Sequence, residues 1–244
     1  MNKILPSISI SLNVILLFAL VSLTYRLGYL GRVFVALNAN ALELPTDTLS
    51  SQSWWQDETK YQVIVAKDKQ YNSCLFGDSI SSGLGNTLGN NTFNFALGGM
   101  STISLIEQLN LLTAAKVKCN KVIIAIGTND ADYRITNTQF IKNMKEIIAT
   151  GKQMGANSVI LIPAFYSTVA ASRDPSMAGP ITRVEEINGL IRQISATEKV
   201  LISGEGIQPL FESQALKQNL TTDGVHLNAD GRKIYRQAIL KIID

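Results

Sequence analysis

The chain has one histidine among its 244 residues, and its charges are few and balanced. A metal site built from several imidazoles is therefore excluded, and any histidine chemistry must rest on His226. Lysine and arginine total 22 and aspartate and glutamate total 19, which leaves a net charge of +3. There is no basic stripe and no block of like charge, so we expect no nucleic-acid partner.

Cysteine is almost as scarce, since only Cys74 and Cys119 occur. Each stands at the start of, or just before, an apolar run that is typical of a buried strand. Two such thiols are more often small core residues than a disulfide or a metal pair. The sequence therefore favours free, buried thiols, with a disulfide as the alternative.

The glycine-rich stretch GDSISSGLGNTLG, residues 77–89, lacks the spacing of a phosphate-binding loop. Leu84 follows Gly83 at the place where an NTPase loop needs lysine. A dinucleotide fingerprint that began at Gly83 and Gly85 would need a third glycine where Leu88 stands. Because neither pattern is met, nucleotide binding is excluded and we expect no cofactor.

Charge is absent altogether between Lys3 and Arg26. The intervening segment, ILPSISISLNVILLFALVSLTY, would span about 33 Å as a helix, which is enough to cross a bilayer. We predict that residues 1–37 form a membrane anchor region with one uncleaved transmembrane helix. A cleaved signal peptide and a buried soluble helix are the alternatives. Positive charges flank the segment on both sides, so the positive-inside rule does not determine its orientation in the membrane. Independently of this rule, we expect the rest of the chain to lie outside the cytoplasm.

Residues 38–60, NANALELPTDTLSSQSWWQDETK, are polar and contain one proline. This composition predicts a linker between the anchor and the domain. Trp54 and Trp55 in this segment could lie at a membrane interface. Such a pair more often packs on the edge of the domain.

Residues 61–244 alternate between strand and helix periodicity, which predicts one α/β domain. The candidate strands are residues 73–77, 92–96, 121–126, 158–162 and 199–202. Between them, apolar residues recur at helical spacing, with Ser101, Pro180 and Asn228 near helix starts and Gly151 or Gly155 near a helix end. The alternation predicts a parallel sheet with helices on both faces. Ligands of such sheets bind beyond the carboxyl ends of the strands.

Four short motifs would lie at that edge of the sheet. GDSI supplies Ser79, NFALGGMST supplies two glycine amides, GTND supplies Asn129, and TTDGVHLN supplies Asp223 and His226. Taken singly, each motif is as well explained by a turn or a helix cap. Within one loop, however, the Asp223 carboxylate can reach Nδ1 of His226, which leaves Nε2 free as a base. Together the motifs hold every residue type that acyl transfer needs.

Read in this order, GDSI, NFALGGMST, GTND and DGVH resemble the motifs of the SGNH/GDSL hydrolase superfamily. The resemblance covers residues 70–244 and implies a flavodoxin-like, three-layer α/β/α sandwich with a parallel five-stranded sheet. Carried over by position, it implies Ser79 as the nucleophile, His226 as the base and Asp223 as the partner of the base. The implied oxyanion donors are the amides of Ser79 and Gly99 and the side chain of Asn129.

One motif departs from the pattern that the family often shows. GGMST has Met100 where Ser-Gly-Asp or Gly-Gly-Asp is frequent. The methionine would change the wall of the substrate pocket but not the backbone amide that donates to the oxyanion. Gly98 is the alternative donor. Asp78 and Asp130 belong to the motifs too, and we expect them to be structural hydrogen-bonding groups at the strand ends.

The resemblance implies a carboxylic ester hydrolase that forms an acyl-enzyme on Ser79. We expect a small acyl group, acetyl above all, on a carbohydrate or lipid. The alternatives are a membrane-tethered O-acyltransferase that uses the same acyl-enzyme and a non-catalytic binding module. The insert AFYSTVAASRDPSMAGPITR, residues 164–183, is expected to border the pocket. Four of its residues would contact the substrate or cover the edge of the core: Phe165, Tyr166, Arg173 and Met177.

Overall fold

The computed structural model describes residues 47–244. The predicted anchor region and residues 38–46 of the predicted linker lie outside the described residues, so the transmembrane helix stays a prediction. Within residues 47–244, no helix is both long enough and apolar enough to cross a bilayer. The described residues all belong to one compact unit.

Five parallel strands form the central sheet in the order β2-β1-β3-β4-β5. Their bounds are β1 Gln70–Gly77, β2 Thr92–Asn94, β3 Lys118–Ala125, β4 Ser158–Ile162 and β5 Leu201–Ile202. The predicted parallel sheet is therefore confirmed, although β1 and β3 begin three residues earlier than expected and β5 is shorter. β5 starts late because Lys199 still caps the preceding helix in a left-handed conformation.

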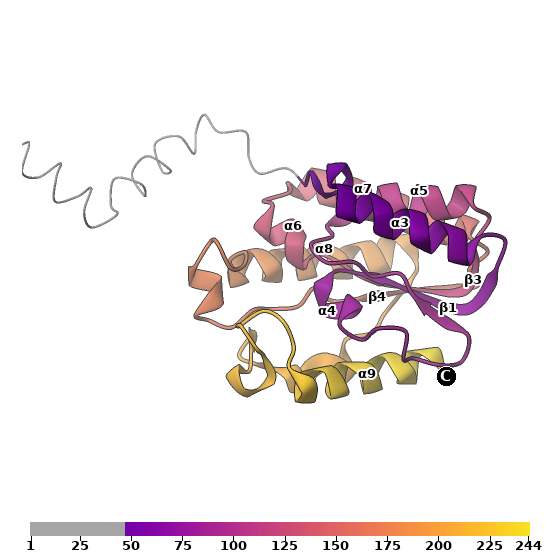
Figure 1. Ribbon diagram of the computed structural model, residues 1–244. Coiled ribbons are helices and arrows are strands. Elements are labelled where there is room, and N and C mark those ends of the chain that lie inside the picture. Colours follow the sequence, from indigo (N-terminus) through magenta and orange to yellow (C-terminus); the bar gives the residue numbers. More distant parts are fainter. Residues whose placement is uncertain (1–46) are drawn as a thin grey trace, which may run out of the picture. The chain divides into compact units, whose positions relative to one another are not determined.

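Helices cover both faces of the sheet, as Figure 1 shows. One face carries α3 (Ser53–Ala66), α5 (Thr102–Ala114), α7 (Asn137–Gln153) and α8 (Ile181–Glu198), whose buried residues share one apolar cluster. The other face carries α4 (Ser79–Ser82), the 3-10 helix η3 (Glu205–Leu210) and α9 (Ala229–Ile243). The short helix α6 (Thr128–Asp132) follows β3. The three-layer α/β architecture is thus confirmed.

Small elements complete the connections between the main layers. They are η1 (Leu49–Ser51), η2 (Ala171–Arg173), the two-stranded pair β6 (Phe211–Glu212) and β7 (Ala215–Leu216), and η4 (Gln218–Leu220). The predicted helix starts also hold. Ser101 caps α5 by accepting from the Ile103 amide, and Asn228 caps α9 by accepting from the Gly231 amide.

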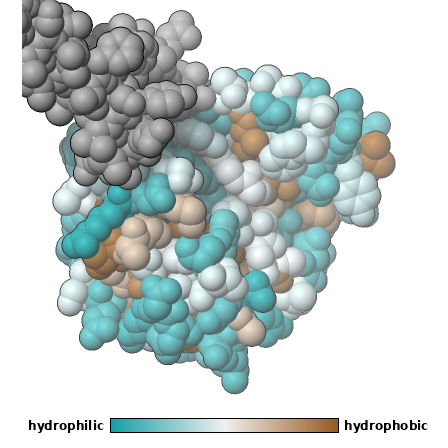
Figure 2. Space-filling view, turned by 60° about the vertical axis from the view of Figure 1, so that its left-hand side comes forward, coloured by the Kyte–Doolittle hydropathy of each residue, from teal (hydrophilic) through white to brown (hydrophobic). Residues whose placement is uncertain are grey.

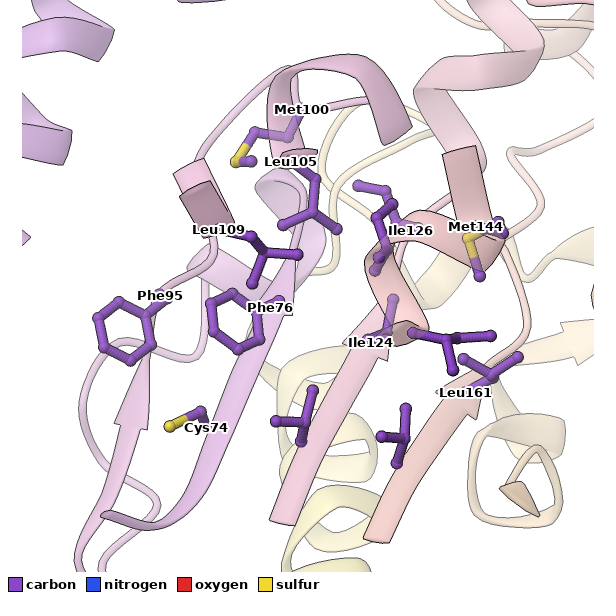
Figure 3. Packing of buried hydrophobic residues seen from close by; sticks show 14 of the residues in the cluster. Cys74, Phe76, Phe95, Met100, Leu105, Leu109, Ile124, Ile126, Met144 and Leu161 are labelled. Carbon is purple, nitrogen blue, oxygen red and sulfur yellow. The ribbon is translucent and has the colours of Figure 1, made fainter. Parts of the chain in front are cut away.

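Alternate residues of the central strands enter the two cores. Phe76, Ile124 and Leu161 lie side by side on β1, β3 and β4 and pack under α5 and α7 (Figure 3). Leu75 and Ile123, one residue earlier, belong to the cluster beneath α9. Strands buried on both faces read as continuous apolar runs, which is why KVIIAI and SVILI could be recognised from the sequence.

The expectation of two free thiols is wrong, because Cys74 and Cys119 form a disulfide. Cys74 lies on β1 and Cys119 on β3, and both side chains are fully buried. The two strands are hydrogen-bonded neighbours, and the Cα atoms of the two cysteines lie 5.8 Å from each other. This proximity depends on which strands lie side by side, which the cysteine spacing does not reveal.

The predicted linker is also corrected over residues 47–60, which belong to the folded domain. Helix α3 begins at Ser53, and Trp55 is only 3% exposed within the core, whereas Trp54 is 50% exposed. Further upstream, Asp47 accepts hydrogen bonds from the hydroxyls of Ser101 and Ser104, both at 2.6 Å. The domain therefore begins before residue 61.

The sequence of helix α3 predicted a linker because half of its buried stripe is polar. The stripe consists of Trp55, Thr59, Gln62 and Ala66. Burial of the Gln62 amide is compensated by hydrogen bonds. Its Oε1 accepts from Gln108 Nε2 at 2.7 Å, and its Nε2 donates to the Phe95 carbonyl at 3.3 Å. Such a stripe gives almost no hydrophobic periodicity in the sequence.

Candidate active site

The predicted site residues gather beyond the carboxyl ends of β1 and β3. Ser79 follows β1, Gly99 lies in the segment after β2, and Asn129 lies in α6 directly after β3. Asp223 and His226 come from the loop that precedes α9. In Figure 1 this edge of the sheet lies at the left, where α4, α6 and the loop before α9 meet.

Ser79, His226 and Asp223 form a continuous line of hydrogen bonds. The Ser79 Oγ lies 2.9 Å from His226 Nε2, and His226 Nδ1 lies 2.6 Å from Asp223 Oδ2. The other carboxylate oxygen of Asp223 accepts from the amides of Val225 and His226, at 2.9 and 2.7 Å. Asp223 therefore holds its own loop and the imidazole at once.

Ser79 is held at the first position of α4 by its neighbours. The Asp78 side chain caps the helix by accepting from the Ile80 amide at 3.0 Å. Gly77 is required, because a Cβ there would lie 2.7 Å from the Ala125 carbonyl oxygen and 2.6 Å from Ser81 Oγ. Ser81 is itself fixed by the buried Tyr235 hydroxyl on α9, at 2.8 Å. Thus α9 supports the helix that carries Ser79.

Hydrogen bonds fix the loop that carries His226 on both sides. The carbonyl of His226 accepts from the Thr222 amide at 3.0 Å and from Thr221 Oγ1 at 2.7 Å. Gly224 has φ +94°, and a Cβ there would lie 2.8 Å from Thr168 Oγ1. The Thr168 amide in turn donates to the Gly224 carbonyl at 2.8 Å. The motif DGVH thus needs its glycine for both backbone conformation and space.

The segment that contains Gly99 is held by α6. Gly99 has φ +72°, which favours glycine, and its carbonyl accepts from the Tyr133 hydroxyl at 3.1 Å. The next carbonyl, that of Met100, accepts from Asn129 Nδ2 at 2.9 Å. One N–H of Asn129 is thereby used, and the second remains available. Within residues 47–244, the amides of Ser79 and Gly99 donate no hydrogen bond. A Cβ at Gly98 would lie 4.0 Å from the Ser79 Cβ.

The GDSL-like lipase/acylhydrolase family model matches residues 75–234, which is about two thirds of the chain. The match includes the predicted site residues Ser79, Gly99, Asn129, Asp223 and His226. The chain belongs to this family. It is therefore a carboxylic ester hydrolase, as the family shows. None of the curated proteins compared matches it.

Solved structures share the fold of this GDSL-like hydrolase. A Streptococcus pneumonia protein named as a platelet activating factor superposes with a TM-score of 0.66 at 18% identity, over 87% of this chain and 99% of its own. A GDSL-like lipase from Bacteroides thetaiotaomicron gives 0.57 at 18% identity, over 86% and 95%. An acetylxylan esterase from Geobacillus stearothermophilus, a catalytic mutant, gives 0.54 at 18% identity, over 72% and 96%.

Electrostatics distinguish the three acidic residues of the motifs. Partial burial raises the pKa of the Asp223 carboxyl, but hydrogen bonds from the His226 side chain and from the His226 and Val225 amides outweigh burial and lower that pKa to about 2. Burial dominates at the other two, and it raises the pKa of Asp78 to about 6 and that of Asp130 to about 7. Asp223 is thus the carboxylate that stays ionised beside His226.

Asp130 connects the two segments that flank the site. Its carboxylate accepts from the Thr102 amide and from Thr102 Oγ1, the latter at 2.5 Å, and Asn143 Nδ2 donates to the same hydroxyl at 2.9 Å. Thr102 opens α5, and Asp130 lies in α6 next to Asn129. The expected structural role of Asp78 and Asp130 therefore agrees with their burial and hydrogen bonds.

The insert of residues 164–183 divides between core and surface. Phe165 is buried and packs edge-to-face on Tyr235 and Phe211, so it covers the core. Tyr166 is half-buried and donates to Glu185. Arg173 and Met177 are exposed.

Sequence reasoning missed two tyrosines that support the site: Tyr133, directly after α6, and Tyr235 on α9. Tyr133 lies four residues after Asn129, and this helical spacing was the only signal that could have indicated it. No sequence signal links Tyr235 to Ser81, because 154 residues separate them. Within the described part of the chain, no group of His, Cys, Asp or Glu side chains could hold a metal ion.

Proposed function

We propose that this hydrolase cleaves carboxylic esters through an acyl-enzyme on Ser79, with His226 as the base and Asp223 as its partner. The observation that carries the proposal is the line of hydrogen bonds from Ser79 Oγ through both ring nitrogens of His226 to Asp223. An activated serine needs a base within hydrogen-bonding reach and a third group that orients the base. The low pKa of Asp223 keeps its negative charge beside the imidazole.

In the first half of the reaction, Ser79 Oγ attacks the ester carbonyl carbon while its proton passes to His226 Nε2. The carbonyl π bond becomes the oxyanion of a tetrahedral intermediate. When this intermediate collapses, the bond to the leaving alcohol breaks, and His226 gives the proton to the alkoxide oxygen. In the second half, water repeats the attack with the same proton route, which releases the acid and restores the Ser79 hydroxyl.

Three donors would hold the oxyanion: the amides of Ser79 and Gly99 and the second N–H of Asn129. The two amides have no acceptor within residues 47–244, and Asn129 is oriented by its bond to the Met100 carbonyl. Donors that are held in advance cost no reorganisation when charge develops. Each donor of this kind typically contributes about 10²–10³ in rate.

The substrate that we propose carries a small acyl group, such as acetyl, on a carbohydrate or lipid. The exposed part of the strand-end face in Figure 2 is mostly teal and white, with brown residues in small patches. A long acyl chain would need a continuous apolar groove. The relative from Geobacillus stearothermophilus is named as an acetylxylan esterase, which fits this substrate class.

We also propose that the catalytic domain lies outside the cytoplasm, tethered by the N-terminal helix that the sequence predicts. Its buried disulfide supports this, because disulfides persist in oxidising compartments and are rare in the cytosol. Protease added to intact cells should then digest the domain without lysis. Digestion only after lysis would contradict the location.

A fluorophosphonate probe tests the proposed nucleophile. We would label residues 45–244, the compact unit, and map the modified peptide. We expect labelling at Ser79 that is lost in Ser79→Ala and in His226→Ala but kept in Ser176→Ala, which alters an exposed serine. No labelling of the folded protein would favour a non-catalytic binding module. Adding sugar acceptors to an ester assay and searching for acylated sugar would detect an acyltransferase.

A further inference from the structure

A pocket of about 250 Å³ opens between the end of α6 and the segment of residues 172–180. The residues that decide its chemistry are Asp132, Tyr133, Arg134, Ser172, Pro175 and Pro180. Pockets for drug-sized ligands measure about 300–1,000 Å³, so this one takes a group of about one sugar ring.

The walls of the pocket are rigid on the α6 side. Gly179 lies directly against the backbone of α6, since a Cβ there would be 2.6 Å from the Ala131 carbonyl carbon. Only glycine can approach so closely, so the segment that carries Pro180 is fixed to the helix that carries Asn129.

The pocket shares a wall with the proposed oxyanion site. Tyr133 lines the pocket, and its hydroxyl donates to the Gly99 carbonyl at 3.1 Å. Asn129, four residues earlier on α6, donates to the Met100 carbonyl. A group bound in the pocket would therefore sit one side chain away from the segment that holds Gly99, as the alcohol part of a bound ester would.

The lining is mixed: Asp132, Arg134 and Ser172 supply polar side chains beside prolines, an alanine and the Tyr133 ring, and it contains no leucine, isoleucine, valine, methionine or phenylalanine. The side chains of Asp132 and Arg134 have no hydrogen-bond or ion-pair partner in the part of the chain that the structure describes. Burial raises the pKa of the Asp132 carboxyl, and the neighbouring Arg134 charge opposes this rise. A carboxylate, a guanidinium and the half-buried Tyr133 ring suit hydroxyl groups on a compact ring better than an acyl chain.

We propose that this pocket binds the sugar ring of an O-acylated carbohydrate, with Asp132 and Arg134 hydrogen-bonding its hydroxyls and Tyr133 packing against its ring. The inference rests on the proposed esterase function and specifies its substrate, because the sugar is the leaving alcohol. The acyl group itself then stays on the Ser79 side of Tyr133.

The kinetic test uses Arg134→Asn. Arg134 has φ +53°, a conformation that asparagine tolerates, so the change removes the guanidinium without new backbone strain. We expect kcat/KM for acetylated xylobiose to fall by about tenfold to a hundredfold relative to that for p-nitrophenyl acetate, the loss of one hydrogen bond to a charged group. Lys199→Asn, an exposed cation at φ +52° before β5, is the matched control and should change neither value.

A binding measurement keeps the inference separate from catalysis. Calorimetry of Ser79→Ala with acetylated xylobiose should show binding that weakens by the same factor when Arg134→Asn is added. Equal affinity in the two proteins, or no binding by Ser79→Ala, would overturn the sugar pocket. So would an altered preference of Arg134→Asn among p-nitrophenyl acetate, butyrate and octanoate, because the pocket would then hold the acyl chain. If Ser79→Ala binds the sugar while the unmodified protein hydrolyses no ester, the proposed function fails instead.

Discussion

Replacement of Asn129 by alanine should slow turnover far more than it weakens substrate binding. The side chain has two N–H groups, of which one is used on the Met100 carbonyl. The other is proposed to meet the oxyanion, which exists only after the attack of Ser79. Its removal should therefore lower kcat by about 10²–10³, or about 2.7–4 kcal/mol of transition-state stabilisation, and leave KM nearly unchanged.

Tyr133→Phe separates the donor from the support of its segment. This variant loses only the bond from the Tyr133 hydroxyl to the Gly99 carbonyl and keeps the Asn129 donor. A neutral hydrogen bond is worth about 1 kcal/mol net, so kcat should fall by no more than about fivefold. The two variants together thus distinguish a missing donor from a loosened loop.

Steady-state kinetics with p-nitrophenyl acetate would measure both effects. Asn120→Ala is a suitable control, because it removes an asparagine that bonds to Gln70 at the opposite end of the sheet. The reasoning is refuted if Asn129→Ala raises KM as much as it lowers kcat, or if its loss is no larger than that of Tyr133→Phe.

Three further predictions concern stability and loop geometry. Replacing Cys74 and Cys119 by alanine opens a loop of 45 residues and should lower the free energy of unfolding by about 4 kcal/mol, as measured by urea denaturation. A decrease below about 1 kcal/mol would contradict the contribution expected from chain entropy. Asp130 has a pKa near 7 in the fold against 3.8 as its ordinary value, so its contribution to stability is full below pH 3.8 and is lost as the pH rises through 7. In Asp130→Asn, the free energy of unfolding should accordingly decline less steeply between pH 3.8 and 7. An unchanged slope of unfolding free energy against pH would argue against the raised pKa of Asp130. Gly224→Ala should displace the loop of His226 and lower kcat by about tenfold or more. The control is Gly89→Ala, where the added methyl has nothing within 4 Å; it should lower only the free energy of unfolding, by about 1–2 kcal/mol.

Particular elements show how far the sequence could predict the fold. The strands β3 and β4 were recognisable because a strand buried on both faces must be continuously apolar. Helix α3 was not, because the polar residues Thr59 and Gln62 occupy its buried stripe. Thr59 donates to the Trp55 carbonyl one turn earlier, and Gln62 is satisfied by Gln108, far along the chain. The pairing of Cys74 with Cys119 was misjudged for a similar reason, since it depends on which strand lies beside β1.

The candidate site divides in the same way. The relation of Asp223 to His226 is local, because three residues of one tight loop suffice to bring the carboxylate to Nδ1. The order of the motifs and the rule that parallel strands end together then indicated that Ser79, Asn129 and this loop would meet. The supports of the site followed no such rule, since Tyr235 reaches Ser81 across 154 residues.

The sequence by itself determined the sheet, the edge at which the motifs gather and the residue types available for chemistry, because periodicity and loop chemistry are properties of neighbouring residues. Only the tertiary structure decided the disulfide, the start of the domain before residue 61, the two tyrosines and the pocket beside Arg134. Each of these depends on contacts between segments far apart along the chain. Such contacts are set by strand order, register and packing, which a single sequence does not encode in any local pattern.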